Sequence, residues 1–391
     1  MNEQIISPVK IIKTYQLTAA DLDLMITYTG GADAAVLVIK DNRAFAVRDR
    51  LLDKLACMRS VLQLDRVFPD PTTADIMEMA DTARSSNVSV VLGIGGGSAM
   101  DSAKAVSLVL SNGGHLEDYL GPGPSRTPRK KEYPLILIPT TCGTGSEVTR
   151  FGVYTSASGR KYTLNTPLLH ADVCVLDHAF ISTLPPALVA ATGFDALSHA
   201  LETLWNKNAT EVSDAAGISA AVMVLASIEE AYHSAQEGKS GGLQELLEAA
   251  CKAGIAFNLT GTAAVHALSF ILGETWHVPH GAACAFTLDD IMNYNMQDPG
   301  TVNKLSRIAG QLFPRSDDPG PAEKLRKHIV KLKKKLGLPV FFKDLGLALS
   351  AGEIQELFKP ALSDPKMNNN IVPLAMKDIT RILHGDALKY R

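Results

Sequence analysis

The sequence predicts two domains, an α/β domain with a mostly parallel sheet followed by an all-helical domain. Continuous apolar runs alternate with helical spacing in the first half of the chain, as expected for strands that are buried on both faces. Strand signals nearly vanish beyond residue 183, where Pro185 and Pro186 suit a helix start. The length of 391 residues also favours more than one domain. We therefore expect domains at 1–183 and 184–391.

Four apolar runs in the first domain are the expected strands, and the segments between them have helical periodicity. This alternation favours a parallel sheet with helices on both faces. The strands are predicted at 34–39, 88–94, 135–138 and 173–176, and the helices at 49–62, 75–85 and 99–110.

Helical periodicity dominates the second domain. Helices are predicted at 185–204, 210–235, 242–257, 263–272, 302–313 and 321–336, with a further helical stretch after His280. The basic run Lys331–Lys335 is expected to be a solvated face of its helix. We find no repeats, no low-complexity tract and no long linker.

Composition and charge exclude several classes of protein. The net charge of −3 does not favour nucleic acid or an anionic membrane as a partner. Polar residues interrupt the N-terminus before a signal peptide could form, and no apolar run is expected to span a membrane. The five cysteines are widely spaced without a Cys-x-x-Cys pair, which fits reduced thiols in the cytoplasm and predicts no cysteine-built metal site.

A glycine-rich turn, Gly95–Ser98, follows the second expected strand and precedes a helix. Glycines let a ligand approach the backbone, and the helix N-terminus attracts a phosphate. Ser98 is expected to cap this helix, with Asp101 three residues later. A tight turn before an ordinary capped helix is an equally good interpretation, since the turn is not a Gly-x-Gly-x-x-Gly fingerprint.

Two further features lie at expected carboxyl ends of strands, where open α/β sheets bind ligands. The segment 139–147 (PTTCGTGSE) is rich in glycine and small hydroxyl residues. Asp41 follows the first expected strand, and its carboxylate suits the adenosine ribose of a dinucleotide and would repel a 2′-phosphate. The alternatives are an ordinary loop and a surface turn residue.

Asp195 and His199 are four residues apart in a helical pattern, so they share one face of the helix. Their neighbours are apolar, and a buried Asp and His need a reason such as a metal. His266 lies in an apolar stretch, and His280 precedes a helix. One carboxylate and three imidazoles suit Fe²⁺ or Zn²⁺. A hydrogen-bonded pair on a helix surface and structural histidines are the alternatives.

Together these segments resemble the iron-containing (group III) alcohol dehydrogenases. The similarity covers the Gly-Gly-Gly-Ser turn with Asp101 and Lys104, and continues through 139–151 (PTTCGTGSEVTRF), 184–202 (LPPALVAATGFDALSHALE), 253–258 (AGIAFN) and 266–285 (HALSFILGETWHVPHGAACA). The resemblance implies a Rossmann-like α/β domain before an all-α domain, the dehydroquinate synthase-like fold, with the active site in the cleft between them.

The resemblance also assigns residues to cofactors. It places one divalent metal, Fe²⁺ first and Zn²⁺ second, on Asp195, His199, His266 and His280. It implies NAD(H) as the coenzyme, held by Asp41, Gly95, Gly96, Gly97, Ser98, Asp101, Thr140, Thr141, Thr144 and Lys161.

One position departs from the family. Many relatives carry a histidine four residues after the first histidine of this region, where it faces the substrate and is discussed as a proton relay. Here that residue is Phe270, which cannot carry a proton. His277 is a candidate substitute, and a solvent chain is another. The substrate pocket is expected to include Phe151, Phe270, Trp276 and Arg150.

The expected function is hydride transfer between NAD(H) and a small aldehyde or primary alcohol, as an aldehyde reductase in the cell. Acid-bearing aldehydes such as succinate semialdehyde or sulfoacetaldehyde are among the candidate substrates. A homodimer or higher homo-oligomer is expected. The alternatives are a polyol dehydrogenase resembling glycerol dehydrogenase, an activity like that of dehydroquinate synthase, and a metal-binding protein without catalysis.

Overall fold

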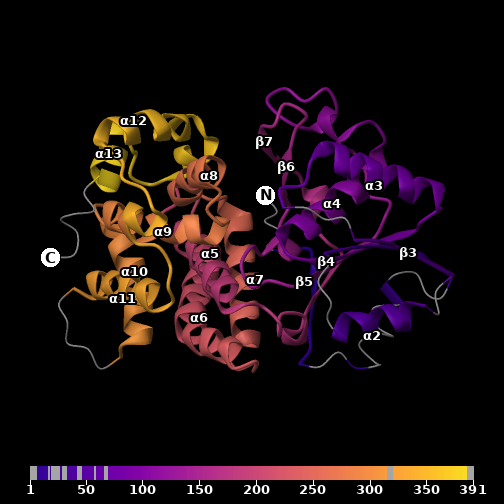
Figure 1. Ribbon diagram of the computed structural model, residues 1–391, viewed down its shortest axis with the longest axis horizontal. Helices are drawn as coiled ribbons and strands as arrows, with labels where there is room; N and C mark the ends of the chain where they lie inside the picture. The colour runs from indigo at the N-terminus through magenta and orange to yellow at the C-terminus, as the bar shows by residue number, and fades with distance from the viewer. Residues whose placement is uncertain are drawn as a thin grey trace. The chain divides into compact units, whose positions relative to one another are not determined.

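The computed structural model describes residues 7–15, 18, 27–28, 33–41, 46–56, 59–65, 69–314 and 320–384. The chain divides into two compact units, Met1–Thr183 and Leu184–Arg391. The first unit holds a parallel sheet flanked by helices, and the second holds helices (Figure 1). This is the α/β and all-α architecture that the sequence predicts.

A six-stranded parallel sheet forms the centre of the first unit, in the order β1-β8-β5-β4-β2-β3. The central strands are buried and, apart from Lys40 at the end of β2, apolar, because helices cover both faces of the sheet. The strands are β1 (Lys10–Lys13), β2 (Ala35–Lys40), β3 (Ser60–Leu64), β4 (Val90–Gly95), β5 (Leu135–Pro139) and β8 (Val173–Leu176).

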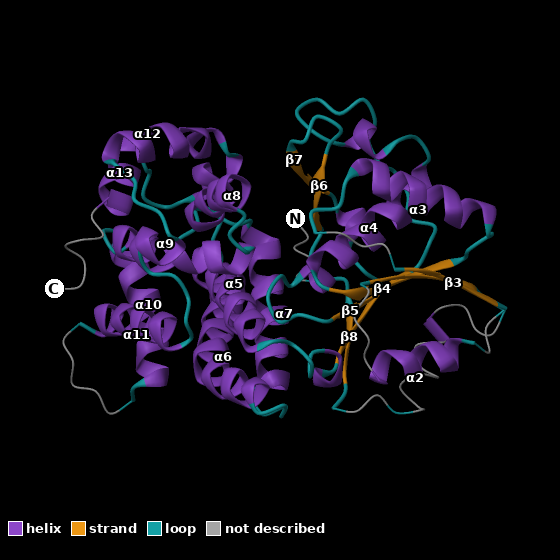
Figure 2. Cartoon of the chain, in the orientation of Figure 1, coloured by secondary structure: helices purple, strands orange, loops and turns teal. Residues whose placement is uncertain are grey.

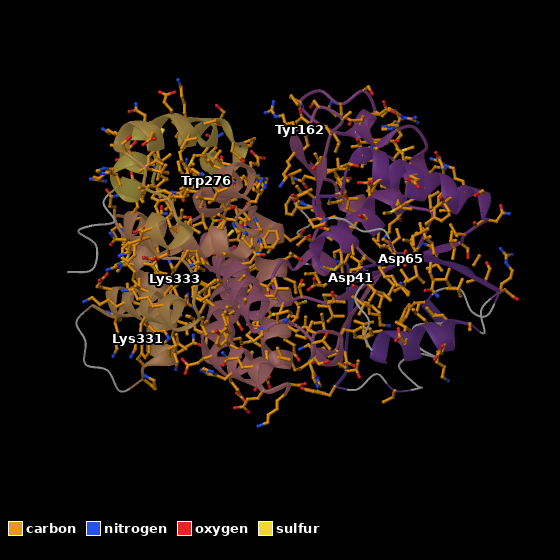
Figure 3. All side chains as sticks on the ribbon, viewed as in Figure 1. Asp41, Asp65, Tyr162, Trp276, Lys331 and Lys333 are labelled. Atoms are coloured by element: carbon orange, nitrogen blue, oxygen red, sulfur yellow. The ribbon has the colours of Figure 1, made fainter. Side chains whose placement is uncertain are left out.

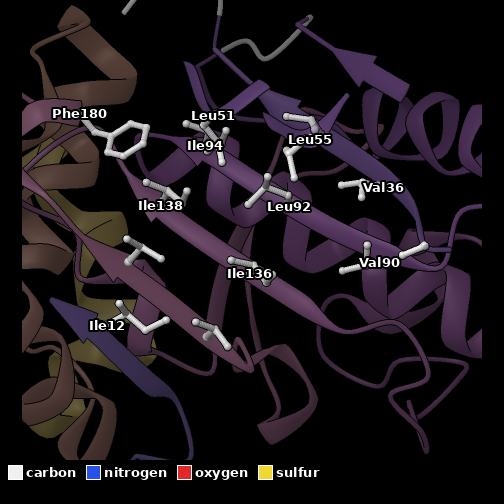
Figure 4. Close-up of a cluster of buried hydrophobic side chains, with 14 residues drawn as sticks. Ile12, Val36, Leu51, Leu55, Val90, Leu92, Ile94, Ile136, Ile138 and Phe180 are labelled. Atoms are coloured by element: carbon white, nitrogen blue, oxygen red, sulfur yellow. The ribbon is translucent and has the colours of Figure 1, made fainter. Parts of the chain in front are cut away.

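Helix α2 (Ala46–Leu55) lies on one face of this sheet, and α3 (Thr73–Ser85) and α4 (Gly97–Asn112) lie on the other (Figure 2). Leu51 and Leu55 of α2 pack with Val36, Leu92 and other strand residues into one apolar cluster (Figure 4). This cluster supports the sheet below the carboxyl ends of its strands.

The sequence analysis did not predict two edge strands and a β-hairpin. The helix expected over 49–62 is wrong at its end, because α2 stops at Leu55 and β3 begins at Ser60. Strands β1 and β3 are short, and lie at opposite edges of the sheet, where half-exposed residues give no continuous apolar run. The antiparallel pair β6 (Phe151–Thr155) and β7 (Lys161–Asn165) forms a second, separate sheet.

The second unit contains the helices that the periodicity predicts, with boundaries shifted by a few residues. They are α5 (Pro186–Leu204), α6 (Glu211–Gln236), α7 (Leu243–Thr260), α8 (Ala264–Trp276), α9 (His280–Asn295), α10 (Pro299–Leu312) and α11 (Pro321–Lys335). Two further helices, α12 (Ala351–Phe358) and α13 (Met376–His384), were not predicted. Among the described residues, α6 is long and apolar enough to cross a membrane by length and composition. It packs against α5 and α7, so we interpret it as a core helix.

The basic run on α11 is not wholly solvated. Lys331 and Lys333 are labelled in Figure 3. Lys331 is exposed, but Lys333 is fully buried and pairs with the buried Asp289 of α9. The interpretation of all five residues as a solvated face was therefore wrong at Leu332 and Lys333, which are both buried. The partner of Lys333 lies 44 residues away, so the local sequence does not reveal the pair.

Candidate metal centre and dinucleotide site

Three adjacent strands of the first unit end at the same edge of the sheet, and each delivers residues of the predicted dinucleotide site. Asp41 follows β2, the glycine turn follows β4, and Thr140 follows β5. The Thr140 hydroxyl donates to Asp41 Oδ2 at 3.1 Å. The structure thus brings together side chains that are about a hundred residues apart in the sequence.

A side chain on Gly95 or Gly97 would clash with its neighbours, and one on Gly96 would be tightly packed. A Cβ on Gly95 would lie 2.4 Å from the Cβ of Ala99, and one on Gly97 would lie 2.9 Å from Thr144 Cγ2. A Cβ on Gly96 would approach Thr141 Cγ2 to 3.3 Å. The backbone and the threonines of 139–147 therefore form a narrow cradle, as close binding of a pyrophosphate requires.

Ser98 does not cap α4, contrary to the expectation. The N-cap is Gly96, without a side-chain capping bond, and Ser98 lies inside the first turn. The expected partner Asp101 instead accepts hydrogen bonds from Ser146 Oγ at 2.7 Å and from the Val153 amide at 2.9 Å. The N-terminus of α4 retains the positive dipole end that suits an anion.

Lys104 lies beneath this cradle and is fully buried. Its ammonium group donates to Ser146 Oγ, Thr149 Oγ1 and the Phe151 carbonyl at 2.8, 3.2 and 2.8 Å, and lies 3.9 Å from Asp101. All three donors of the ammonium are thus matched. This Lys104 cluster ties the loop that follows β5 to α4.

Burial shifts the pKa values of Lys104 and of the carboxyl groups near it. It lowers the pKa of Lys104 to about 8, although Asp101 and Glu147 act in the opposite direction. It raises the pKa of Glu147 to about 7, against the effect of its own backbone and of Lys104. Asp101 also has a raised pKa, because burial outweighs Lys104.

Other predicted residues of the first unit lie on the hairpin or next to it. Lys161 begins β7 and pairs with Asp70 at 2.9 Å. The guanidinium of Arg150 lies 5.6 Å from the ring centroid of Phe151, whose carbonyl accepts from Lys104.

Three helices of the second unit place the predicted metal ligands side by side. Helix α5 carries Asp195 and His199, α8 carries His266, and α9 begins at His280. Asp195 Oδ1 lies 3.8 Å from His199 Nδ1, 3.4 Å from His266 Nε2 and 3.5 Å from His280 Nε2. The His199 ring stacks on that of His266, with 4.3 Å between centroids.

Buried atoms in this group fit a cation. Asp195 Oδ1 and His266 Nε2 are buried and make no hydrogen bond among the described residues. Burying such atoms unmatched is costly, and a metal would satisfy both. Burial disfavours ionised Asp195, but His199, His280 and His266 hold its pKa well below the usual range, so it is a carboxylate ready to bind a cation.

The sequence analysis missed Glu202, which orients one of these ligands. Glu202 is fully buried on α5 and accepts from the amides of Ala263 and Val265. Its Oε2 lies 2.6 Å from His266 Nδ1. Since a carboxylate only accepts, Nδ1 carries the hydrogen and Nε2 keeps its lone pair for a metal. The sole local signal was a charged residue within an apolar helical stretch.

Cys284 was also missed as part of this site. It is fully buried on α9, one turn after His280, with its sulfur 3.8 Å from His280 Nε2. Its sulfur and one ligand atom each of Asp195, His266 and His280 all lie within 4.8 Å of one another, whereas the predicted ligand His199 is not part of this group. Burial raises the pKa of the thiol, but His266 and His280 outweigh it and bring it down to about 7.

The three aromatic or titratable residues near the end of α8 have different surroundings. The centroid of the Phe270 ring lies 5.9 Å from that of the His280 ring, and Lys366 Nζ lies 4.2 Å from the centroid of Phe270. Trp276 packs with Phe342 and Phe358, at 6.4 and 6.5 Å between ring centroids. His277 is exposed and ends the helix with φ 55°.

Comparison with known proteins agrees with this architecture. Residues 19–178 match the family described as iron-containing alcohol dehydrogenase, and residues 189–387 match the C-terminal part of the Fe-containing alcohol dehydrogenase family. The chain belongs to the iron-containing alcohol dehydrogenase family. The sequence-based identification of the family and of its fold is thereby confirmed.

Similar proteins in this family include an alcohol dehydrogenase and two sulfoacetaldehyde reductases. Alcohol dehydrogenase 4 of Saccharomyces cerevisiae is 32% identical over 82% of this chain and 81% of its own. Sulfoacetaldehyde reductase of Bilophila wadsworthia is 35% identical over 66% of this chain and 68% of its own. The structure of sulfoacetaldehyde reductase from Bifidobacterium kashiwanohense, in complex with NAD⁺, superposes with a TM-score of 0.87 at 27% identity, covering 100% of both chains.

Proposed function

We propose that this protein interconverts a small aldehyde and its primary alcohol, with NAD(H) and one divalent metal, and acts as an aldehyde reductase in the cell. Membership of the family supports this reaction class. The observation that carries the proposal is the convergence of Asp195, His266 and His280, with two buried atoms that a cation would satisfy. Fe²⁺ is the expected metal and Zn²⁺ the alternative.

The first unit is proposed to hold the dinucleotide. Asp41 accepts hydrogen bonds from the adenosine ribose, and the cradle at Gly95–Ser98 receives the pyrophosphate at the start of α4. The threonines Thr140, Thr141 and Thr144 line that cradle, and Lys161 is a further proposed contact. When bound, the metal polarises the carbonyl oxygen and the dinucleotide exchanges a hydride with the carbonyl carbon.

Phe270 excludes water beside the proposed metal centre and supplies no proton. Proton exchange with the substrate oxygen is therefore proposed to use solvent or the exposed His277. Cytoplasmic location and a homo-oligomeric state remain predictions from the sequence.

For the substrate, we propose an aldehyde that bears an acidic group, such as sulfoacetaldehyde or succinate semialdehyde. The similarity to two sulfoacetaldehyde reductases supports this choice. Arg150 is the proposed partner of the acidic group. In that case Arg150→Ala should raise KM for these aldehydes and leave KM for propanal unchanged. Equal changes for both classes would remove Arg150 from substrate recognition.

An aldehyde panel tests the proposal directly. Protein loaded with Fe²⁺ or Zn²⁺ is assayed with NADH and NADPH on acidic and uncharged short aldehydes, and Asp195→Ala is the matched inactive control. We expect NADH oxidation with at least one aldehyde and none in the control. No turnover with any aldehyde and either metal would contradict the proposal and favour a metal-binding protein without catalysis.

Asp41 is expected to favour NADH by about 10–100-fold in kcat/KM, or roughly 1.4–2.8 kcal/mol, because its carboxylate repels a 2′-phosphate. Asp41→Gly should narrow that ratio. Equal kcat/KM values for NADH and NADPH in the unmodified protein would contradict this role.

A further inference from the structure

The sulfur of Cys284 lies among ligand atoms of three predicted metal-binding residues. Helix α9 places Cys284 four residues after His280, so both side chains point to one face. The sulfur and His280 Nε2 are 3.8 Å apart. Cys284 is fully buried, so its sulfur is held next to the predicted ligands.

We propose that Cys284 is a metal ligand in addition to the four predicted ones. The inference rests on the proposed metal-dependent function. It is carried by the mutual approach, within 4.8 Å, of the Cys284 sulfur and ligand atoms of Asp195, His266 and His280. Those atoms come from three helices, and the two that are buried without hydrogen-bond partners belong to Asp195 and His266.

The surroundings of Cys284 differ from those of a cysteine that only fills the core. Cys251 of α7 is also buried, yet among the described residues it belongs to no such group. On coordination the Cys284 thiol gives its proton to solvent, and the sulfur lone pair forms the bond to the metal. Sulfur is a softer donor than carboxylate oxygen or imidazole nitrogen, so it favours Zn²⁺ more than an N/O set would.

Cobalt substitution tests this ligand without measuring activity. The full-length protein is stripped with a chelator and loaded with Co²⁺, and its absorption spectrum is recorded. We expect an intense near-ultraviolet charge-transfer band from sulfur to cobalt. The band should vanish in Cys284→Ser while weaker visible bands show that cobalt is still bound, and it should persist in the matched control Cys251→Ser. A band that survives in Cys284→Ser would overturn the proposal.

Zinc affinity and X-ray absorption give a second test. Cys284→Ser should weaken Zn²⁺ binding at least about tenfold, since even an outer-shell partner is worth about 10–100-fold. The Zn²⁺ form of the unmodified protein should show a sulfur neighbour at about 2.3 Å. This measurement needs no variant, so a folding defect in Cys284→Ser does not affect it.

The two proposals fail in different ways. If the unmodified protein binds neither Co²⁺ nor Zn²⁺, the metal-dependent function fails and the Cys284 ligand fails with it. If it binds both metals with only nitrogen and oxygen neighbours, the metal-dependent function stands and the role of Cys284 is overturned.

Discussion

Each unit of this protein buries a charged group, but the two groups differ in whether their polar atoms have hydrogen-bond partners. In the first unit, the three donors of Lys104 meet Ser146, Thr149 and the Phe151 carbonyl. In the second unit, Asp195 Oδ1 and His266 Nε2 have no hydrogen-bond partner among the described residues.

This difference separates structural from ligand-binding roles. A buried charge that is fully matched stabilises the surrounding backbone, whereas converging buried atoms that are left unmatched indicate a place for a ligand. The Lys104 cluster therefore shapes the cradle from below, and the Asp195 group holds the proposed metal. Substitutions in the two units should affect different properties.

The largest effect is expected for His266→Ala. It removes a central nitrogen donor, so metal affinity should fall by more than the roughly 10–100-fold that an outer-shell partner contributes, and activity should nearly vanish. Elemental analysis after dialysis measures the metal, and His233→Ala on the exposed part of α6 is the control. Full metal occupancy in His266→Ala would contradict the metal assignment.

Lys104→Met should destabilise the protein by about 3–5 kcal/mol, because it leaves the carboxyl groups of Asp101 and Glu147 buried without their cation. Amide hydrogen exchange should show faster exchange in α4 and β6, while metal content stays unchanged. Lys130→Met, which removes an exposed ion pair, should have little effect. If Lys104→Met lost metal while amide hydrogen exchange in α4 and β6 stayed unchanged, the structural role given to Lys104 would be contradicted.

Glu202→Gln tests the orientation of His266. The amide has about the same size but weakens the bond to Nδ1, so metal affinity should fall about 10–100-fold while the fold is kept. Competition with a chelator measures the affinity, and Glu230→Gln on the exposed side of α6 is the matched control. An unchanged affinity would limit Glu202 to holding the start of α8.

The smallest effect is expected for His277→Ala. Its side chain is exposed, so solvent can exchange protons at the same place, and kcat should change less than about threefold. Metal content should stay the same. A loss of about 10²–10⁴-fold in kcat would instead identify His277 as the general acid.

The sequence by itself determined the features that depend on local pattern. Continuous apolar runs marked β2, β4, β5 and β8, because strands buried on both faces must be apolar throughout. The change to helical periodicity marked the all-helical second half. The glycine turn after β4 and the Asp195/His199 spacing on α5 were visible for the same reason, since each lies within a few residues of the sequence.

Only the tertiary structure decided the features that depend on distant partners. Short edge strands such as β3 become strands because a neighbour such as β2 pairs with them, and their own residues carry little signal. The burial of Lys333 requires Asp289, and the role of Glu202 requires His266, 64 residues away. In the sequence, Cys284 is indistinguishable from an ordinary apolar residue of α9. Only the fold brings its sulfur close to predicted ligands from two other helices. The chemical properties of a side chain follow from its residue type, whereas the neighbours that determine its function are brought together only by folding.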